Sequence, residues 1–362
     1  MVVLAHVENV GRAANWPIIQ HSYLFVDFFF VLSGFIIFEN YFQRLKQGFS
    51  ISRFMFLRFG RLYPLHLFVL SLFVINELSR LGASEAIAGG SQAAFTGPNS
   101  GEALVSHLLL LNAMSLQAFS TWNWPSWSIG AEFYTYLVFA LMIRFSGDAI
   151  VPATLAIALV AALELWRSGH ANMRITYDLG LIRCILGFGI GALCSRLHQW
   201  RGDRLPATTA KATAGEAVAL GGVILFVVQA GGNQLSFLAP LVFAAAVLIF
   251  AQEAGAFSRL LRTPPFRLLG KLSYSIYMIH AFVLMALANA LRSAGEAAGI
   301  ALTTMTYLGG DPVIAFGAQP WQGDIAQFVL LVPVVMVAFV TYQLVEVPGR
   351  LWSRRVAPRI GL

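Results

Sequence analysis

The sequence has little charge and almost no cysteine. Only 11% of its 362 residues are charged, whereas 58% are hydrophobic. A water-soluble domain of this length needs a more charged surface, so the composition excludes an ordinary soluble enzyme and indicates a polytopic membrane protein. Its two cysteines, Cys184 and Cys194, lie in one apolar segment. This excludes a disulfide framework and a CxxC metal or redox motif, and we expect no metal site.

The sequence contains many long apolar runs. Segments of about the length that crosses a bilayer lie near residues 24–42, 61–76, 127–146, 149–166, 180–197, 216–230, 236–252, 272–291 and 325–346. Residues 1–8 form about a third of a spanning helix, which predicts a truncated first helix. We therefore expect one integral-membrane domain, residues 1–362, with an all-α fold: a polytopic bundle of about ten transmembrane helices.

The connections between these runs alternate in charge. Basic residues cluster in the linkers 43–62, 195–215 and 253–271 and in the C-terminal tail. By the positive-inside rule, these stretches and both termini lie in the cytoplasm of a multi-pass protein, in a bacterial inner or plasma membrane. The scheme requires residues 103–118 to re-enter the membrane or lie along its outer interface. Because topology explains the net charge of +7, we expect the lipid bilayer as a partner and no nucleic acid.

Ionisable side chains inside apolar runs suggest functions, because each costs about 2.5 to 3.5 kcal/mol at mid-bilayer. His6 is the best candidate for a general base, since its ordinary pKa of about 6.5 is near working pH; a structural histidine is the alternative. Glu132 lies about 7 Å deeper along its predicted helix than Trp127, and we expect it to face a partner or a watery pocket. Asp27 heads an apolar run that the Ser33–Gly34 pair interrupts.

Two further groups combine polar side chains with helical spacing. Arg58 and Arg61 share one helical face, with Arg53 one to two turns earlier. Guanidinium groups bind phosphate oxygens bidentately, which predicts a phosphate site, with a cytoplasmic anchor as the alternative. The stretch "LGKLSYSIYMIH" ends at His280, about 13 Å past Lys271 along a helix. We expect His280 to help shape a polar cavity, although hydrogen bonding between helices also explains such a segment.

Five motifs together resemble the integral-membrane acyltransferase 3 family, whose members O-acylate surface and secreted carbohydrates. In order, they are "VDFFFVLSGFII", "RFGRLYPLH", "WSIGAEFYTYL", "LGKLSYSIYMIH" and "LVEVPGR". The resemblance implies acyl transfer, usually of acetyl, from cytoplasmic acyl-CoA to a hydroxyl of an extracytoplasmic carbohydrate or glycolipid. It implies acyl-CoA as a substrate and no permanently bound cofactor. Family members also carry an arginine upstream of the first-helix histidine, at a position that would precede Met1 here.

The resemblance places family motifs on His6, Arg58, Arg61, Ser33, Gly34, Phe35, Trp127, Ser128 and Glu132. The path that the topology permits suggests roles for these residues and for their neighbours. The expected catalytic residues are His6, Glu132 and Asp27. His6 would act as base or acyl carrier, and Glu132 would hold the second imidazole nitrogen or stabilise the imidazolium. Asp27 would orient a polar neighbour. The expected donor-binding residues are Arg58, Arg61, Arg53, Ser33 and Gly34. The expected acceptor-binding residues are Trp127, Ser128, Tyr134 and His280.

Other functions stay open at this point. A solute transporter would also place ionisable residues inside a helix bundle, but it predicts inverted repeats or paired broken helices, and the sequence shows neither. A non-catalytic membrane receptor, or an inactive truncated homologue, is the third alternative. For Ser33 and Gly34, the alternative to donor binding is simple helix packing.

Overall fold

The computed structural model of the chain describes residues 1–81, 93–202, 208–308 and 311–360. Within these residues, 7 helical stretches are long and apolar enough to cross a membrane: Pro17–Lys46, Ile51–Leu81, Trp124–Arg167, Gly180–Arg201, Thr209–Ala230, Pro264–Ala298 and Pro320–Val356. The structure therefore supports a membrane helix bundle, whereas the predicted count of about ten helices is not confirmed. Part of the basic linker 195–215 lies outside the described residues.

The long helices lie at the predicted apolar segments. They are α3 (Phe25–Lys46), α4 (Ile51–Leu81), α6 (Trp127–Ser146), α7 (Ile150–Arg167), α8 (Gly180–Arg201), α9 (Thr209–Ala230), α10 (Ala239–Phe250), α12 (Pro264–Ala298) and α14 (Leu331–Thr341). However, α4 and α12 extend well beyond the predicted 61–76 and 272–291, and the predicted 325–346 is divided among several helices. After α14 the chain continues through a π-helical turn, η7 (Tyr342–Glu346), into α15 (Val347–Val356). Shorter helices are α1 (Val2–Ala5), α2 (Pro17–Gln20), α5 (Gly101–Leu108), α11 (Ala256–Leu261) and α13 (Pro320–Val329).

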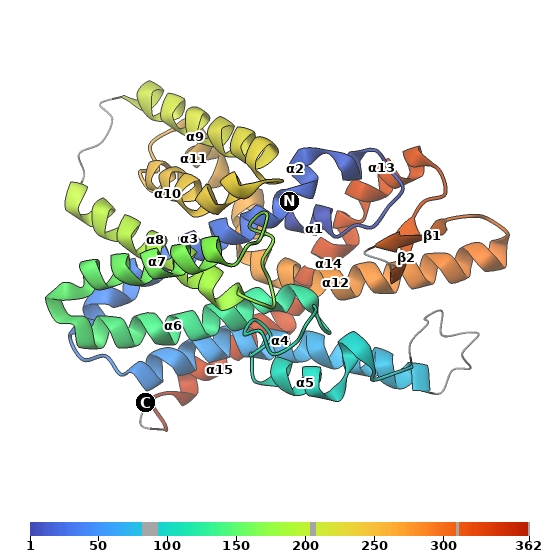
Figure 1. Cartoon of the computed structure of the whole chain (residues 1–362), viewed down its shortest axis with the longest axis horizontal. Coiled ribbons are helices and arrows are strands. Elements are labelled where there is room, and N and C mark those ends of the chain that lie inside the picture. Colours follow the sequence, from blue (N-terminus) through green and yellow to red (C-terminus); the bar gives the residue numbers. More distant parts are fainter. Residues whose placement is uncertain (82–92, 203–207, 309–310, 361–362) are drawn as a thin grey trace.

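Local sequence signals set several helix ends. α12 begins with two prolines, Pro264 and Pro265, whose missing N–H groups cost nothing in a first helical turn. It ends at Gly299, which has a left-handed φ of 67°. α6 and α7 are separated by Gly147, with φ of 56°, and they lie side by side after the chain reverses (Figure 1). One apolar stretch thus contains two helices.

Among the described helices, α3 and α8 form the most extensive contact. A Cβ atom on Gly34 would overlap the carbonyl oxygen of Phe188, and one on Gly191 would overlap that of Val31. Glycine at both positions lets the two backbones approach, as small residues do between membrane helices. This interface sets the position of α3, which carries Asp27 and Ser33.

The two ends of the bundle differ in character. Figure 1 shows the α3–α4 connection and the α6–α7 turn at one end, and a β-hairpin beside α12 at the opposite end. At the first end, Lys46 Nζ lies 2.7 Å from Asp148 Oδ1. At the other end, β1 (Thr303–Leu308) pairs antiparallel with β2 (Asp311–Phe316). The structure is consistent with the predicted all-α class, and this hairpin is an addition to the helix bundle. β-Branched residues in it, including Thr304, Thr306 and Ile314, suit a strand.

The predicted segments 103–118 and 1–8 do not form membrane-spanning helices. In the stretch 103–118, α5 ends at Leu108 and turns follow, so this segment does not form a spanning helix. Its position relative to the bilayer stays a prediction. In residues 1–8 only Val2–Ala5 are helical, and Asn9 then pairs with Phe316 of the hairpin.

Candidate functional site

A cavity of about 290 Å³ lies between α3, α4, α6 and α12. Its polar lining residues are Ser33, Arg58, Arg61, Ser128, Glu132, Tyr136, Ser273, Tyr274 and Tyr277. Aromatic and aliphatic side chains, among them Phe29, Phe30 and Ile36, form the rest of the wall. The fold thus brings the predicted arginine pair, serine and glutamate into one cavity, although they are far apart in the sequence.

Glu132 accepts hydrogen bonds from two hydroxyl groups in this cavity. Ser33 Oγ and Tyr136 Oη each donate to Glu132 Oε1 at 2.5 Å, and the two hydroxyls are 3.1 Å apart. Ser33 comes from α3, whereas Tyr136 lies one turn after Glu132 on α6. The prediction did not include Tyr136, although the spacing of four residues places it on the same helical face.

The two cavity arginines have different surroundings. Arg58 Nη2 donates to Tyr41 Oη at 2.9 Å, and its guanidinium lies 5.0 Å from the Tyr41 ring centroid. Its Nε–H is buried and has no hydrogen-bond partner within the described part of the chain. Leaving such a donor unpaired costs about 1 to 3 kcal/mol, which a bound anion would offset. Arg61 is exposed, so the cavity opens at this residue.

Arg53 does not reach the cavity. Its guanidinium lies 5.7 Å from the ring centroid of Phe49, and it is not among the lining residues. Gly34 also faces away from the cavity, toward Phe188 on α8. Tyr134 donates to the carbonyl of Leu109 at 2.9 Å and so ties α6 to the turn after α5. The structure therefore places these three predicted residues outside the cavity.

His6 and His280 form a pair at the edge of this region. His6 Nδ1 lies 2.9 Å from His280 Nε2, and the rings stack with centroids 5.0 Å apart at 21°. His280 Nδ1 lies 2.6 Å from the carbonyl oxygen of Tyr277. Glu132, which was expected at the second nitrogen of His6, instead accepts hydrogen bonds from Ser33 and Tyr136. The structure places His280 at that nitrogen.

Tyr277 lines the cavity and also contacts the histidine pair, with its ring centroid 5.8 Å from that of His280. Ser128 Oγ donates to Tyr277 Oη at 2.8 Å, and Tyr277 Oη donates to the carbonyl of Pro125 at 2.7 Å. Tyr277 and Ser128 line the cavity, but His6 and His280 do not. One turn of α12, Tyr277 to His280, therefore contacts both the start of α6 and His6.

His6 is neutral near pH 7. It follows α1 and lies outside the long apolar helices. Burial, and then the positive charge of Arg174, lower the pKa of His6 to about 4. A neutral imidazole can accept a proton, which is the property that a general base requires.

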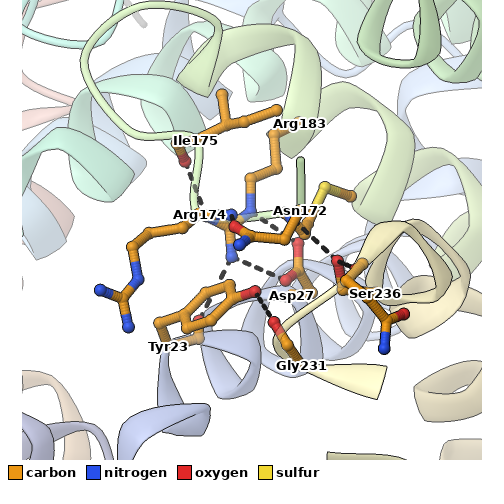
Figure 2. Close-up of polar contacts among 10 residues, drawn as sticks. Tyr23, Asp27, Asn172, Arg174, Ile175, Arg183, Gly231 and Ser236 are labelled. Carbon is orange, nitrogen blue, oxygen red and sulfur yellow. Dashed lines mark hydrogen bonds and ion pairs between the residues drawn. The ribbon is translucent and has the colours of Figure 1, made fainter. Parts of the chain in front are cut away.

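Asp27 forms a buried ion pair rather than facing the cavity. Arg183 Nε and Nη2 donate to Asp27 Oδ1 and Oδ2 at 2.9 and 2.7 Å, and both side chains are at most 1% exposed. Arg183 Nη1 also donates to the carbonyl of Ile175 at 2.6 Å, as Figure 2 shows. Trp127 packs against this guanidinium, 5.3 Å from ring centroid to Cζ. Asp27 and Trp127 thus join α3, α6 and α8.

The sequence interpretation did not single out Arg183. The signal for it is a guanidinium inside the apolar stretch that precedes the basic linker 195–215. An unpaired charge there is too costly, so a carboxylate partner is required. Removing one member of such a buried pair typically costs about 3 to 5 kcal/mol. This contact accounts for the intramembrane acid at Asp27.

A family model described as an acyltransferase domain matches residues 1–344. The chain belongs to the acyltransferase 3 family. This acyltransferase is 31% identical over 157 residues to Protein 2 in picA locus of Rhizobium radiobacter, a match that covers 40% of this chain and 76% of that protein. It is 32% identical over 145 residues to Acyltransferase MdmB of Streptomyces mycarofaciens, covering 39% of this chain but only 30% of MdmB. No solved structure matches it.

The acyltransferase also contains buried polar groups that the sequence interpretation did not assign. His66 Nε2 donates to the carbonyl of His107 at 2.9 Å, and His107 Nε2 lies 2.8 Å from Thr121 Oγ1. On α12, Ser275 Oγ donates to Glu346 Oε2 at 2.7 Å. Glu346 belongs to the "LVEVPGR" motif, which was quoted for the family resemblance without a role for its acid.

Proposed function

We propose that this acyltransferase moves an acyl group from cytoplasmic acyl-CoA to a hydroxyl group on the other side of the membrane. Acetyl is the expected acyl group, and a carbohydrate or glycolipid is the expected acceptor. The observation that supports this proposal is the cavity between α3, α4, α6 and α12, in which Arg58 and Arg61 share the wall with Glu132. Family membership supports the acyl transfer itself.

Arg58 and Arg61 are proposed to bind the phosphates of the donor. Arg58 lies seven residues, about 10 Å, from the first residue of α4, at the end of the bundle that carries the basic α3–α4 connection. The unpaired Nε–H of Arg58 and the exposed guanidinium of Arg61 are available for phosphate oxygens. The pantetheine arm then extends along the cavity past Ser33 and Glu132.

The reaction takes place at His6 in this proposal. The acceptor oxygen attacks the thioester carbonyl carbon, a C–O bond forms, the C–S bond breaks, and the hydroxyl proton passes through His6 to the departing thiolate of CoA. Alternatively, His6 itself attacks and carries the acyl group before the acceptor takes it. In either case the thioester must pass the cavity wall near Tyr277, because His6 and His280 do not line the cavity and Tyr277 contacts His280.

Release of CoA from purified protein tests the donor site. In lipid nanodiscs with acetyl-CoA, water can stand in for the acceptor hydroxyl, and free thiol reports turnover. We expect Arg58→Ala and Arg61→Ala each to raise the KM for acetyl-CoA about tenfold or more, because each removes charge-assisted hydrogen bonds to phosphate. Arg144→Ala, an exposed arginine of α6 outside the cavity, is the matched control.

The same assay tests the role of His6. His6→Ala should lower kcat about 10²- to 10⁴-fold, which is the usual contribution of a general acid–base group. His198→Ala, on α8 and outside the cavity and the histidine pair, should leave kcat unchanged. Solute uptake into proteoliposomes without any release of CoA would reject the acyltransferase mechanism in favour of transport.

A further inference from the structure

We propose that His280 is a positioning residue, which holds His6 in the tautomer whose Nε2 carries no hydrogen. Nε2 is then the atom that takes the acceptor proton or attacks the thioester. This inference rests on the proposed function for its catalytic consequence. The tautomer itself follows from the hydrogen bonds of the pair.

The first step concerns His280. A carbonyl oxygen only accepts hydrogen bonds, so His280 Nδ1, 2.6 Å from the Tyr277 carbonyl, must carry a hydrogen. His280 is fully buried, and no carboxylate in the described ranges is hydrogen-bonded to it. Burying an unpaired charge is too costly, so the ring is neutral. A neutral imidazole has one N–H, which leaves His280 Nε2 as an acceptor.

The second step uses the acceptor role of His280 Nε2 to assign the hydrogen of His6. At 2.9 Å from His280 Nε2, His6 Nδ1 must be the donor. Because His6 is neutral, its only hydrogen is then on Nδ1, and Nε2 is free. The stacking of the rings and the edge of Trp124, 6.3 Å between centroids, restrict rotation of the imidazole. The backbone of α12 thereby determines which nitrogen of His6 can react.

The arrangement has a chemical consequence. When His6 Nε2 accepts a proton, the resulting imidazolium still donates from Nδ1 to His280 Nε2, so the new charge keeps a hydrogen-bond acceptor. The acceptor hydroxyl, His6 and His280 thus act as reacting group, base and orienting group. Serine hydrolases use a carboxylate as the orienting group, whereas here it is a neutral imidazole. If His6 carries the acyl group, the same free Nε2 is the nucleophile.

Nitrogen NMR of the unmodified protein tests the tautomer without reference to activity. In nanodiscs with ¹⁵N-labelled histidine, the His6 signals are those lost in His6→Asn. We expect His6 to show a protonated Nδ1 and an unprotonated Nε2 near pH 7. A protonated Nε2 would overturn the inference. Absence of CoA release from this folded protein would instead reject the proposed function and leave the tautomer assignment standing.

Substitutions at His280 test the catalytic consequence. In His280→Gln the amide oxygen can accept from His6 Nδ1 near the position of the lost Nε2, whereas His280→Leu keeps bulk without an acceptor. We expect kcat to fall about 100-fold or more in His280→Leu, and by about tenfold or less in His280→Gln. The KM for acetyl-CoA should change by less than about twofold in both, because His280 does not line the donor cavity.

A double-mutant cycle distinguishes positioning from a general structural role. If His280 acts through His6, His280→Leu should cause no further loss of kcat in a His6→Ala background. A further loss of similar size there would overturn the inference, as would normal kcat in His280→Leu alone. Unchanged binding of CoA, measured by calorimetry, shows that each variant is folded.

Discussion

Asp27 and Glu132 are two carboxylates inside apolar helices, and their neighbours give them different functions. Asp27 is fully buried against the guanidinium of Arg183, so its charge is already compensated and no surface is left for a substrate. Glu132 is only half-buried and accepts from the uncharged hydroxyls of Ser33 and Tyr136. Glu132 therefore lines the cavity together with Arg58 and Arg61.

The pH dependence of the reaction should reflect the lowered pKa of His6. The folded-state pKa is about 4 instead of the ordinary 6.5, because burial and Arg174 disfavour the protonated ring. The basic form is therefore present above about pH 4 and is lost as the pH falls through that value. We expect kcat/KM for acetyl-CoA to change less than about twofold between pH 8 and pH 5.5, and to fall below that range.

The profile is measured by CoA release in nanodiscs, with thermal stability recorded at each pH as a control for unfolding. An exposed histidine would instead lose activity through its ordinary pKa of about 6.5. A midpoint there, with the protein still folded, would show that His6 is not the proton acceptor.

At the scale of elements, the α3–α8 interface holds the site together. Glycines on both helices allow the contact, and Gly187 and Gly191 form a small-xxx-small pair on α8. The same helix α8 carries Arg183, the partner of Asp27, while α3 carries Ser33 into the cavity. Close packing of these two helices thus sets the position of one wall of the proposed donor site.

We predict that Gly191→Leu destabilises the protein and lowers its activity. The new side chain would overlap the Val31 carbonyl and meet the backbone of Phe35, which forces α3 away from α8. Overpacking of this kind typically costs about 1 to 3 kcal/mol. Thermal unfolding of the detergent-purified protein, together with CoA release, measures both effects.

Gly221→Leu is the matched control for this prediction. Gly221 lies inside α9, is exposed, and has no atom within 4 Å of an added Cβ. Its substitution should leave both the unfolding temperature and the activity unchanged. Equal stability of the two variants would show that the α3–α8 contact tolerates separation.

At the scale of the whole molecule, the two ends of the bundle should lie on opposite sides of the membrane. The α3–α4 connection and the hairpin occupy opposite ends in Figure 1, and the basic linkers favour the cytoplasm for the first. We predict that an impermeant maleimide labels Tyr307→Cys in intact cells, but Gln47→Cys only after permeabilisation. Both residues are exposed, and native Cys184 and Cys194 are buried, which keeps the background low. The reverse labelling would contradict the topology.

Local rules of sequence were enough to predict the apolar segments, their approximate boundaries and the arginine pair of α4. Apolar length indicates spanning helices, and a spacing of three residues places two side chains on a shared face. The resemblance of five motifs to the acyltransferase 3 family likewise indicated acyl transfer. The β-hairpin was not predicted, because its two short strands lie in a linker whose composition resembles a loop.

Which polar groups meet one another depends on the tertiary structure alone. Asp27 pairs with Arg183, 156 residues away, and His6 with His280, 274 residues away. No local pattern contains this information, because an intramembrane charge or imidazole requires a partner but does not specify which helix supplies it. That choice depends on how the helices pack, and glycine contacts such as those between α3 and α8 determine the packing.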